Sequence, residues 1–258
     1  MIKIDGSYGE GGGQILRTAI GLSVLTDRPV EIFNIRKNRP NPGIKPQHYS
    51  SINIVKKICD AEVKGLDISS KKIIFKPGKI KAGKFEFDIG TAGSITLAFQ
   101  SVILGCLKSD KKNTIKLIGG TDVKWSPSWD FFTNVFLKLI KKMGVCVEPV
   151  LIKRGYYPKG GGIAKITIDK VADINPFIVK SKQDFSKIKG IINISKLPDH
   201  IFKRIKHTCI KETMKKDIRA SIEVEKEDSF SPGVGVTLFS EIKNTVLGSS
   251  VIGEKGIS

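Results

Sequence analysis

This 258-residue chain has only four cysteines and three histidines, which limits the metal sites it can build. The cysteines lie far apart and none forms a CxxC pair, which argues against a zinc site. Each has apolar neighbours, which predicts small buried side chains in a reducing compartment. His200 and His207 lack partners at ligand spacing and His48 stands alone, so surface or structural roles are favoured.

Further absences narrow the class of protein. No apolar run is long enough to span a bilayer, and the first residues follow a strand pattern instead of that of a signal peptide. We therefore expect a cytoplasmic chain with no membrane partner. The sequence also lacks a P-loop, a GxSxG motif and a dinucleotide-binding fingerprint, so phosphate chemistry would need another architecture.

Acidic residues are outnumbered, with 25 aspartates and glutamates against 44 lysines and arginines. The resulting net charge of +19 favours a polyanionic partner, above all nucleic acid. A lysine-rich thermophile composition is the alternative explanation. Charge alone therefore does not identify the partner.

Glycine is abundant, and four glycines surround Glu10 in segment 9–17. Glycines that open a helix let an anion approach free N–H groups and the positive end of the helix dipole. Arg17, one turn after Gly13, can direct its planar guanidinium at the same anion. The alternative is a surface turn that only links a strand to a helix.

Segment 35–48 is basic and contains three prolines, which stiffen it. Arg36 and Arg39, three residues apart, can bracket a phosphate through bidentate contacts. A solvated basic loop explains the segment equally well in isolation, but its closeness to the glycine segment favours an anion site. Further along, Pro127 and Phe131 form either a flat wall for a purine or part of the core.

The order of predicted elements repeats within residues 1–168, which predicts an α/β fold with an internal duplication. Each copy has a strand, a glycine loop, a helix, a strand, a second helix and further strands. The predicted helices are 14–26, 48–59, 95–107 and 128–143, and the predicted strands are 2–5, 30–35, 61–63, 72–75, 85–89, 114–117, 145–152 and 163–168.

A smaller α/β unit follows a polar, lysine-rich linker predicted at 181–189. It has a basic amphipathic helix at 198–216 and strands at 190–195, 218–225 and 234–239. We divide the chain into a repeat-built core at 1–182 (two repeats and the start of a third), a smaller inserted domain at 183–252, and a return to the core at 253–258.

Several motifs, taken in order, closely resemble those of the RNA 3′-terminal phosphate cyclase family. They cover essentially the whole chain, and six in register are highly specific although each is moderate alone. The quoted segments are Ile4–Gly6, Gly9–Arg17, Ile35–Arg36, Arg39, Pro42–Gly43, Gln47–His48, Gly90, Ala92–Ser94, Gly119–Asp122, Gly155–Pro158, Gly160–Gly162 and Gly253–Lys255.

The resemblance implies repeated units of two helices on a four-stranded sheet, the enolpyruvyl transferase-like architecture, with a smaller α/β domain inserted. It also implies a cytoplasmic ligase of RNA processing. ATP adenylylates a histidine of such an enzyme, AMP passes to an RNA 3′-phosphate, and the vicinal 2′-OH attacks. The product is a 2′,3′-cyclic phosphate, and a divalent cation, Mg²⁺ or Mn²⁺, is required.

Residue roles also follow from the resemblance. Glu10 is similar to the family's metal- and ATP-proximal carboxylate, and three arginines are similar to its phosphate-binding ones. A glutamine–histidine pair matches residues that flank this pocket, and three further residues match its ATP contact and adenine wall. The phosphate-binding arginines are Arg17, Arg36 and Arg39, and the flanking pair is Gln47 and His48. The ATP contact is Gln100, and the adenine wall is formed by Pro127 and Phe131.

One feature departs from the family pattern. The family's nucleophilic histidine follows the inserted domain, and none of the three histidines here occupies that motif. The resemblance therefore predicts a chain that lacks the rest of the third repeat and is inactive alone. The alternative is a non-catalytic RNA-binding scaffold, as in the family's ribosome-biogenesis branch.

Overall fold

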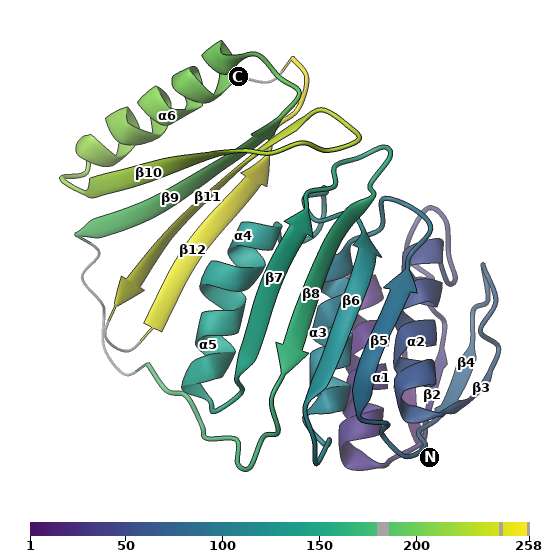
Figure 1. Ribbon diagram of the computed structural model, residues 1–258. Helices are drawn as coiled ribbons and strands as arrows, with labels where there is room; N and C mark the ends of the chain where they lie inside the picture. Colours follow the sequence, from purple (N-terminus) through teal and green to yellow (C-terminus); the bar gives the residue numbers. More distant parts are fainter. Residues whose placement is uncertain (180–185, 243–244, 257–258) are drawn as a thin grey trace.

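The computed structural model describes residues 1–179, 186–242 and 245–256, and contains three four-stranded sheets (Figure 1). No helix in these ranges is both long and apolar enough to cross a membrane. The first two sheets and their helices have the same order of elements, β-α-β-α-β-β. The predicted duplication and the architecture of two helices on a four-stranded sheet are therefore confirmed.

The first unit places its four strands in the order β1-β2-β4-β3, with β1 and β2 parallel. Buried Leu16, Ile20 and Val24 recur every four residues and form the inner face of α1. The helix α2 begins at Pro46, earlier than predicted, because proline is well accommodated in a first turn. The elements are β1 (Ile2–Asp5), α1 (Gly13–Thr26), β2 (Val30–Phe33), α2 (Pro46–Cys59), β3 (Glu62–Lys64) and β4 (Ile73–Lys76).

The second unit repeats this arrangement in the order β5-β6-β8-β7, with β5 and β6 parallel. Its second helix was predicted as one element over 128–143, and a five-residue π-helical segment interrupts it. The elements are β5 (Gly83–Asp88), α3 (Ile95–Cys106), β6 (Asn113–Gly119), α4 (Trp129–Phe131), η1 (Phe132–Phe136), α5 (Leu137–Lys142), β7 (Val147–Lys153) and β8 (Gly162–Ile168).

The third sheet has the order β10-β9-β11-β12, and α6 packs on β9 and β10. The predicted linker is wrong at 187–189, which belong to β9, while 180–185 lie outside the described residues. The sequence prediction also missed β12, which completes the sheet beside β11. The elements are β9 (Lys187–Ser195), α6 (Asp199–Met214), β10 (Arg219–Lys226), β11 (Gly233–Ile242) and β12 (Thr245–Ile252). The domain boundaries stay a prediction.

One hydrophobic core joins the first two units, because α1 and α2 pack against α3 between the two sheets (Figure 1). The α4–α5 helix has two apolar faces. Trp129 and Phe132 face this core, whereas Val135 packs with Phe239 and Val246 of the third sheet. The helix therefore joins the second unit to the third.

The fold brings the sequence motifs to one edge. Strands β5, β6 and β7 point toward the same edge of the second sheet, where glycine loops follow their last residues (Figure 1). Gly120 and Gly160 both lie against Ala92, and Gly93 lies against Gln47 at the start of α2. The loops of both units thus form one continuous surface.

Candidate phosphate-binding site

The first glycine loop and the basic loop are in direct contact. Asn38 Nδ2 donates to the Ser7 carbonyl at 2.9 Å, and Arg39 Nη2 donates to Glu10 Oε2 at 2.7 Å. A side chain in place of Gly12 would lie beside the Arg39 guanidinium. The glycine loop and the basic loop therefore meet at the start of α1.

His48 is buried in this site and its imidazole lies against Gly13. Burial, followed by the charges of Arg17, Arg36 and Lys45, lowers the pKa of His48 to about 3. Its Nδ1 accepts from the Lys45 backbone N–H at 3.2 Å, which assigns the remaining proton to Nε2. His48 is therefore neutral at neutral pH and presents an Nε2–H donor toward the glycine loop.

Arg17 is 7% exposed, and burial lowers its pKa to about 10, so it remains a cation at neutral pH. Nη2 donates to Gln14 Oε1 at 3.1 Å, but Nε has no hydrogen-bond partner among the described residues. Buried polar atoms are normally satisfied. A buried cation with an unsatisfied donor, at a helix N-terminus lined by glycine, is suited to an anionic ligand.

Arg36 stabilises the basic loop itself, whereas Gln47 lies where this loop meets the second unit. Arg36 Nη1 donates to the Asn41 and Gly43 carbonyls at 2.7 and 3.3 Å, so it closes the basic loop on itself. Burial, followed by the Arg39 charge, lowers the pKa of Arg36. Gln47 is exposed and links the site to Gly93 of the second glycine loop.

The proposed ATP contacts lie around α3 and α4. The Ser94 hydroxyl caps α3 by accepting from the Leu97 N–H at 3.2 Å, and the Thr96 hydroxyl donates to the Pro127 carbonyl at 2.8 Å. Pro127 is thereby held beside the second glycine loop. Half-buried Gln100 lies further along α3, and Phe131 packs with Val135 against the third sheet.

Substitution of Gly13 by alanine should disturb the site strongly. The new Cβ would meet the His48 ring and the Arg17 guanidinium, and the buried imidazole has little room to move. We expect a loss of stability of about 1–3 kcal/mol together with weaker phosphate binding, measured by thermal unfolding and by titration with ATP. Gly12→Ala is the matched control, since its nearest neighbour would lie at an ordinary 3.7 Å. Equal effects of the two substitutions would contradict this assignment.

The sequence interpretation missed a buried ionic network between the second and third units. Arg154, fully buried, donates to Asp122 at 3.1 Å and Asp130 at 2.8 Å, and also pairs with Glu225 of β10. Asn193 of β9 donates to Asp130 at 2.7 Å. Asp122 entered the sequence interpretation only within the motif Gly119–Asp122. The residues that bury this carboxylate are distant in the sequence, so no local pattern predicts the network.

The described residues contain no group of three or more histidine, cysteine or acidic side chains able to hold a metal ion. Cys59 and Cys106 are buried as predicted, and burial raises the Cys106 pKa to about 12. Cys146 is exposed, so the prediction of burial was wrong there. It lies just before edge strand β7, where its neighbours do not cover it.

Fold and site together define a duplicated α/β protein with glycine loops, arginines and a neutral histidine at one edge. A family model described as RNA 3′-terminal phosphate cyclase matches residues 8–243. Proteins named RNA 3′-terminal phosphate cyclase are similar along 99% of this chain: that of Archaeoglobus fulgidus is 44% identical and that of Methanopyrus kandleri 42%. The chain covers 76% and 75% of them, respectively. The chain belongs to the RNA 3′-terminal phosphate cyclase family.

Proposed function

We propose that this protein acts in the ATP-dependent conversion of an RNA 3′-phosphate to a 2′,3′-cyclic phosphate. The function rests on family membership, because its relatives carry the cyclase name. The same comparisons do not favour the alternative of a non-catalytic scaffold. Ring closure joins the 2′-oxygen to the 3′-phosphorus, the bond from that phosphorus to AMP breaks, and the 2′-hydroxyl proton is released.

The structural observation that supports the proposal is the Arg17 guanidinium beside the neutral imidazole of His48, both against Gly13 of the first glycine loop. Fixed donors at the position where phosphate charge develops are the main catalytic device in phosphoryl transfer. In this proposal Arg17, Arg39 and His48 Nε2–H hold phosphate oxygens, and Arg36 keeps the basic loop in shape. Gln47 flanks the pocket.

The nucleotide contacts are part of the same proposal. Pro127 lies beside the second glycine loop through Thr96, where it would contact the adenosine together with Gln100. Phe131, at the end of α4, would supply the wall of the adenine pocket. The same side chain also packs against the third sheet. These three roles rest on the resemblance and on the position of α3.

Glu10 is the proposed ligand of the divalent cation. Its carboxylate is 87% exposed and reaches Arg39, so it contributes one oxygen ligand and no protein cage surrounds it. Such a site fits Mg²⁺, which retains waters and binds through one or two carboxylates plus substrate phosphates. The ion would supply charge neutralisation on the phosphates when bound.

The direct test of this function compares two RNAs that differ only at the 3′ end. RNA with a 3′-phosphate should bind more tightly than the same RNA with a 3′-hydroxyl. Because none of the three histidines matches the family's nucleophile, the cyclic end, detected by resistance to phosphatase, should form with ATP and Mg²⁺ once a segment that carries this nucleophilic histidine is supplied. Equal binding of the two RNAs, with no cyclic product, would reject the proposal.

Arg39→Ala separates ligand binding from stability. The Arg39–Glu10 pair is exposed, and such pairs stabilise proteins little, so the melting temperature should change by less than about 2 °C. The Kd for ATP or RNA 3′-phosphate should rise about tenfold or more, because a hydrogen bond to a charged oxygen is lost. A lowered melting temperature with unchanged affinity would instead make Arg39 a structural residue.

A further inference from the structure

Exposed aromatic side chains gather on the edge that carries the glycine loops. Among the described residues, all exposed tryptophan, tyrosine and phenylalanine side chains lie in loops of this edge or in the first turn of a helix that begins there. Trp125 is 97% exposed, Tyr8 84% and Tyr157 76%. The two others are Tyr49, in the first turn of α2, and Phe230, in the loop before β11.

These loops touch one another and the candidate site. The segment that carries Trp125 and the segment that carries Tyr157 are joined where the Asp122 N–H donates to the Gly155 carbonyl at 3.2 Å. Both segments pack on Ala92 through Gly120 and Gly160. Ala92 belongs to the loop that meets Gln47, so Trp125 and Tyr157 lie on the side of the site formed by the second unit.

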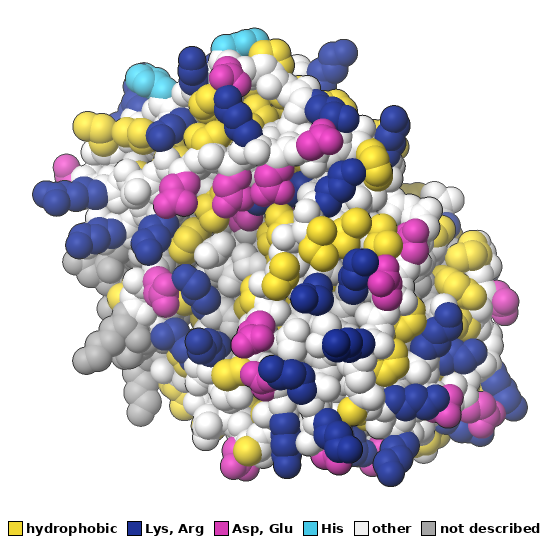
Figure 2. Space-filling model, in the orientation of Figure 1, with side chains coloured by type: hydrophobic (Ala, Val, Ile, Leu, Met, Phe, Trp, Pro, Cys, Tyr) yellow, Lys and Arg dark blue, Asp and Glu magenta, His cyan; other side chains and the backbone are white. Residues whose placement is uncertain are grey.

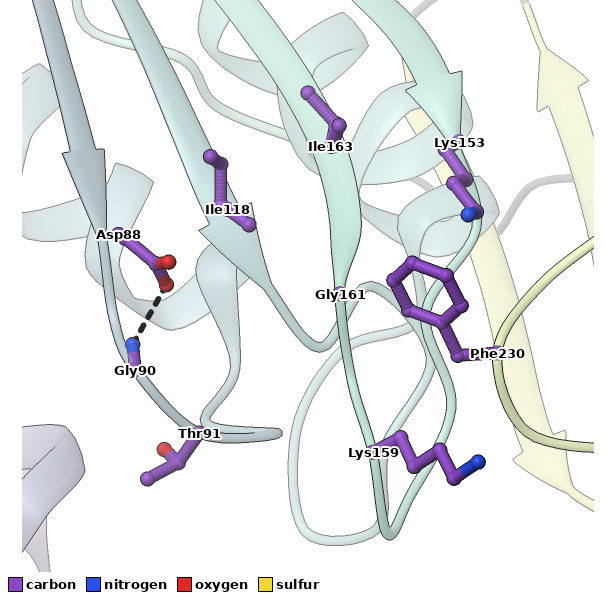
Figure 3. A pocket seen from close by; sticks show the side chains of 9 residues that line it. All are labelled: Asp88, Gly90, Thr91, Ile118, Lys153, Lys159, Gly161, Ile163 and Phe230. Atoms are coloured by element: carbon purple, nitrogen blue, oxygen red, sulfur yellow. Dashed lines mark hydrogen bonds between the residues drawn. The ribbon is translucent and has the colours of Figure 1, made fainter.

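Cations accompany these aromatic rings. A pocket of about 320 Å³ opens beside Gly161, and Lys153, Lys159 and Phe230 help to line it (Figure 3). The Lys153 ammonium lies 3.4 Å from the centre of the Phe230 ring, and Gly161 lies against that ring (Figure 3). Lys153 thus already occupies part of the Phe230 surface, and Trp125 and Tyr157 are the two most exposed aromatic rings that the second unit contributes.

The positive charge of the surface favours a nucleic acid as the partner of these aromatic rings. Lysine and arginine side chains spread over the face that includes the second and third sheets, with fewer acidic ones among them (Figure 2). Proteins that hold single-stranded nucleic acid combine cations along the backbone with aromatic rings on which bases stack. Aromatic residues tend to be at least partly buried, so a tryptophan that is 97% exposed on the edge of the glycine loops is suited to a stacking ligand.

We propose that Trp125 and Tyr157 form a stacking platform for the single-stranded RNA nucleotides that precede the terminal phosphate. Lys159 provides a cation for their backbone phosphates. This inference rests on the proposed function, since it places the RNA 3′ end at Arg17 and His48. Stacking is tolerant of sequence because every base has a π-face, so the platform selects single-stranded ends over any particular base.

The test compares an oligouridylate of about eight nucleotides with uridine 3′-monophosphate, both carrying a 3′-phosphate. Trp125→Ala and Tyr157→Ala should each raise the Kd of the oligonucleotide about 5- to 100-fold. Both should change the Kd of the mononucleotide less than about twofold, because the phosphate site is intact. Trp125→Phe, which keeps a ring, should retain most of the affinity, and Met214→Ala removes another exposed apolar side chain, at the end of α6, as the control.

Tryptophan fluorescence gives a second readout. The chain has two tryptophans, and Trp129 is only 4% exposed, so quenching by the oligonucleotide should come from Trp125 and vanish in Trp125→Phe. Unchanged oligonucleotide affinity in both alanine variants would overturn the platform while leaving the proposed function intact. Weaker ATP binding or a changed oligomeric state, without loss of oligonucleotide affinity, would also overturn it. Failure of both ligands to bind the unaltered protein would reject the proposed function itself.

Discussion

Replacing Arg154 with methionine should lower the free energy of unfolding by about 3–5 kcal/mol and the melting temperature by about 10 °C. Arg154 is fully buried and pairs with Asp122 and Asp130, which are almost fully buried themselves. Without the guanidinium, two neighbouring carboxylates would remain in the interior with no cation. Loss of one partner of a buried pair is far more destabilising than loss of the whole pair, because the remaining charge is uncompensated.

The pH dependence of the Arg154→Met variant identifies the cause. Burial and the Asp130 charge raise the pKa of Asp122, whereas Arg154 lowers it, so the substitution should raise it further. A carboxyl group with a raised folded pKa stabilises below its unfolded pKa, and this stability is lost as the pH rises through the folded pKa. The deficit of Arg154→Met should therefore be larger near about pH 7.5 than near about pH 5.

Two further variants complete this experiment, which is read by thermal unfolding. Asp122→Asn added to Arg154→Met should recover part of the lost stability, because it removes one uncompensated charge. Arg204→Met, on the exposed face of α6, is the matched control and should change stability by less than about 0.5 kcal/mol. A melting temperature of Arg154→Met equal to that of the control would contradict the assigned role of the network.

Arg17→Ala should raise the Kd of RNA 3′-phosphate about 10- to 100-fold. Arg17 is a buried cation at the start of α1, and its guanidinium lies against Gly13, where a phosphate oxygen would approach the glycine loop. The affinity of the same RNA with a 3′-hydroxyl should change much less, because it has no terminal phosphate to contact. The ratio of the two Kd values, measured by titration, thus isolates the phosphate contact from general charge attraction.

Arg17→Lys and Arg28→Ala sharpen the interpretation. Lysine keeps the charge but lacks the planar fork, so only part of the affinity should remain. Arg28 follows the opposite end of α1 and is exposed, so its loss should leave both RNAs bound as before. A loss of folding in Arg17→Ala, with normal affinity in the folded fraction, would show that Arg17 serves the core and not the ligand.

The sequence alone predicted the repeated α/β architecture, because that information is local. Apolar residues recur with helical or strand spacing, and glycine loops mark the junctions between strands and helices. The glycine segment around Glu10 and the basic loop of Arg36 and Arg39 were predicted as one anion site. The structure brings Arg39 into contact with Glu10, whereas anion binding at this place stays a prediction.

Tertiary structure decided what depends on contacts between distant residues. The protonation state of His48 depends on its burial beside Arg17, and the Arg154 network joins strands separated by more than sixty residues. The location of Trp125 and Tyr157 on one edge depends on the alignment of parallel strands. Periodicity records which side of an element is buried, whereas burial of charge and convergence of loops depend on how whole sheets pack. The chain therefore encodes its units locally, and only their packing forms the site.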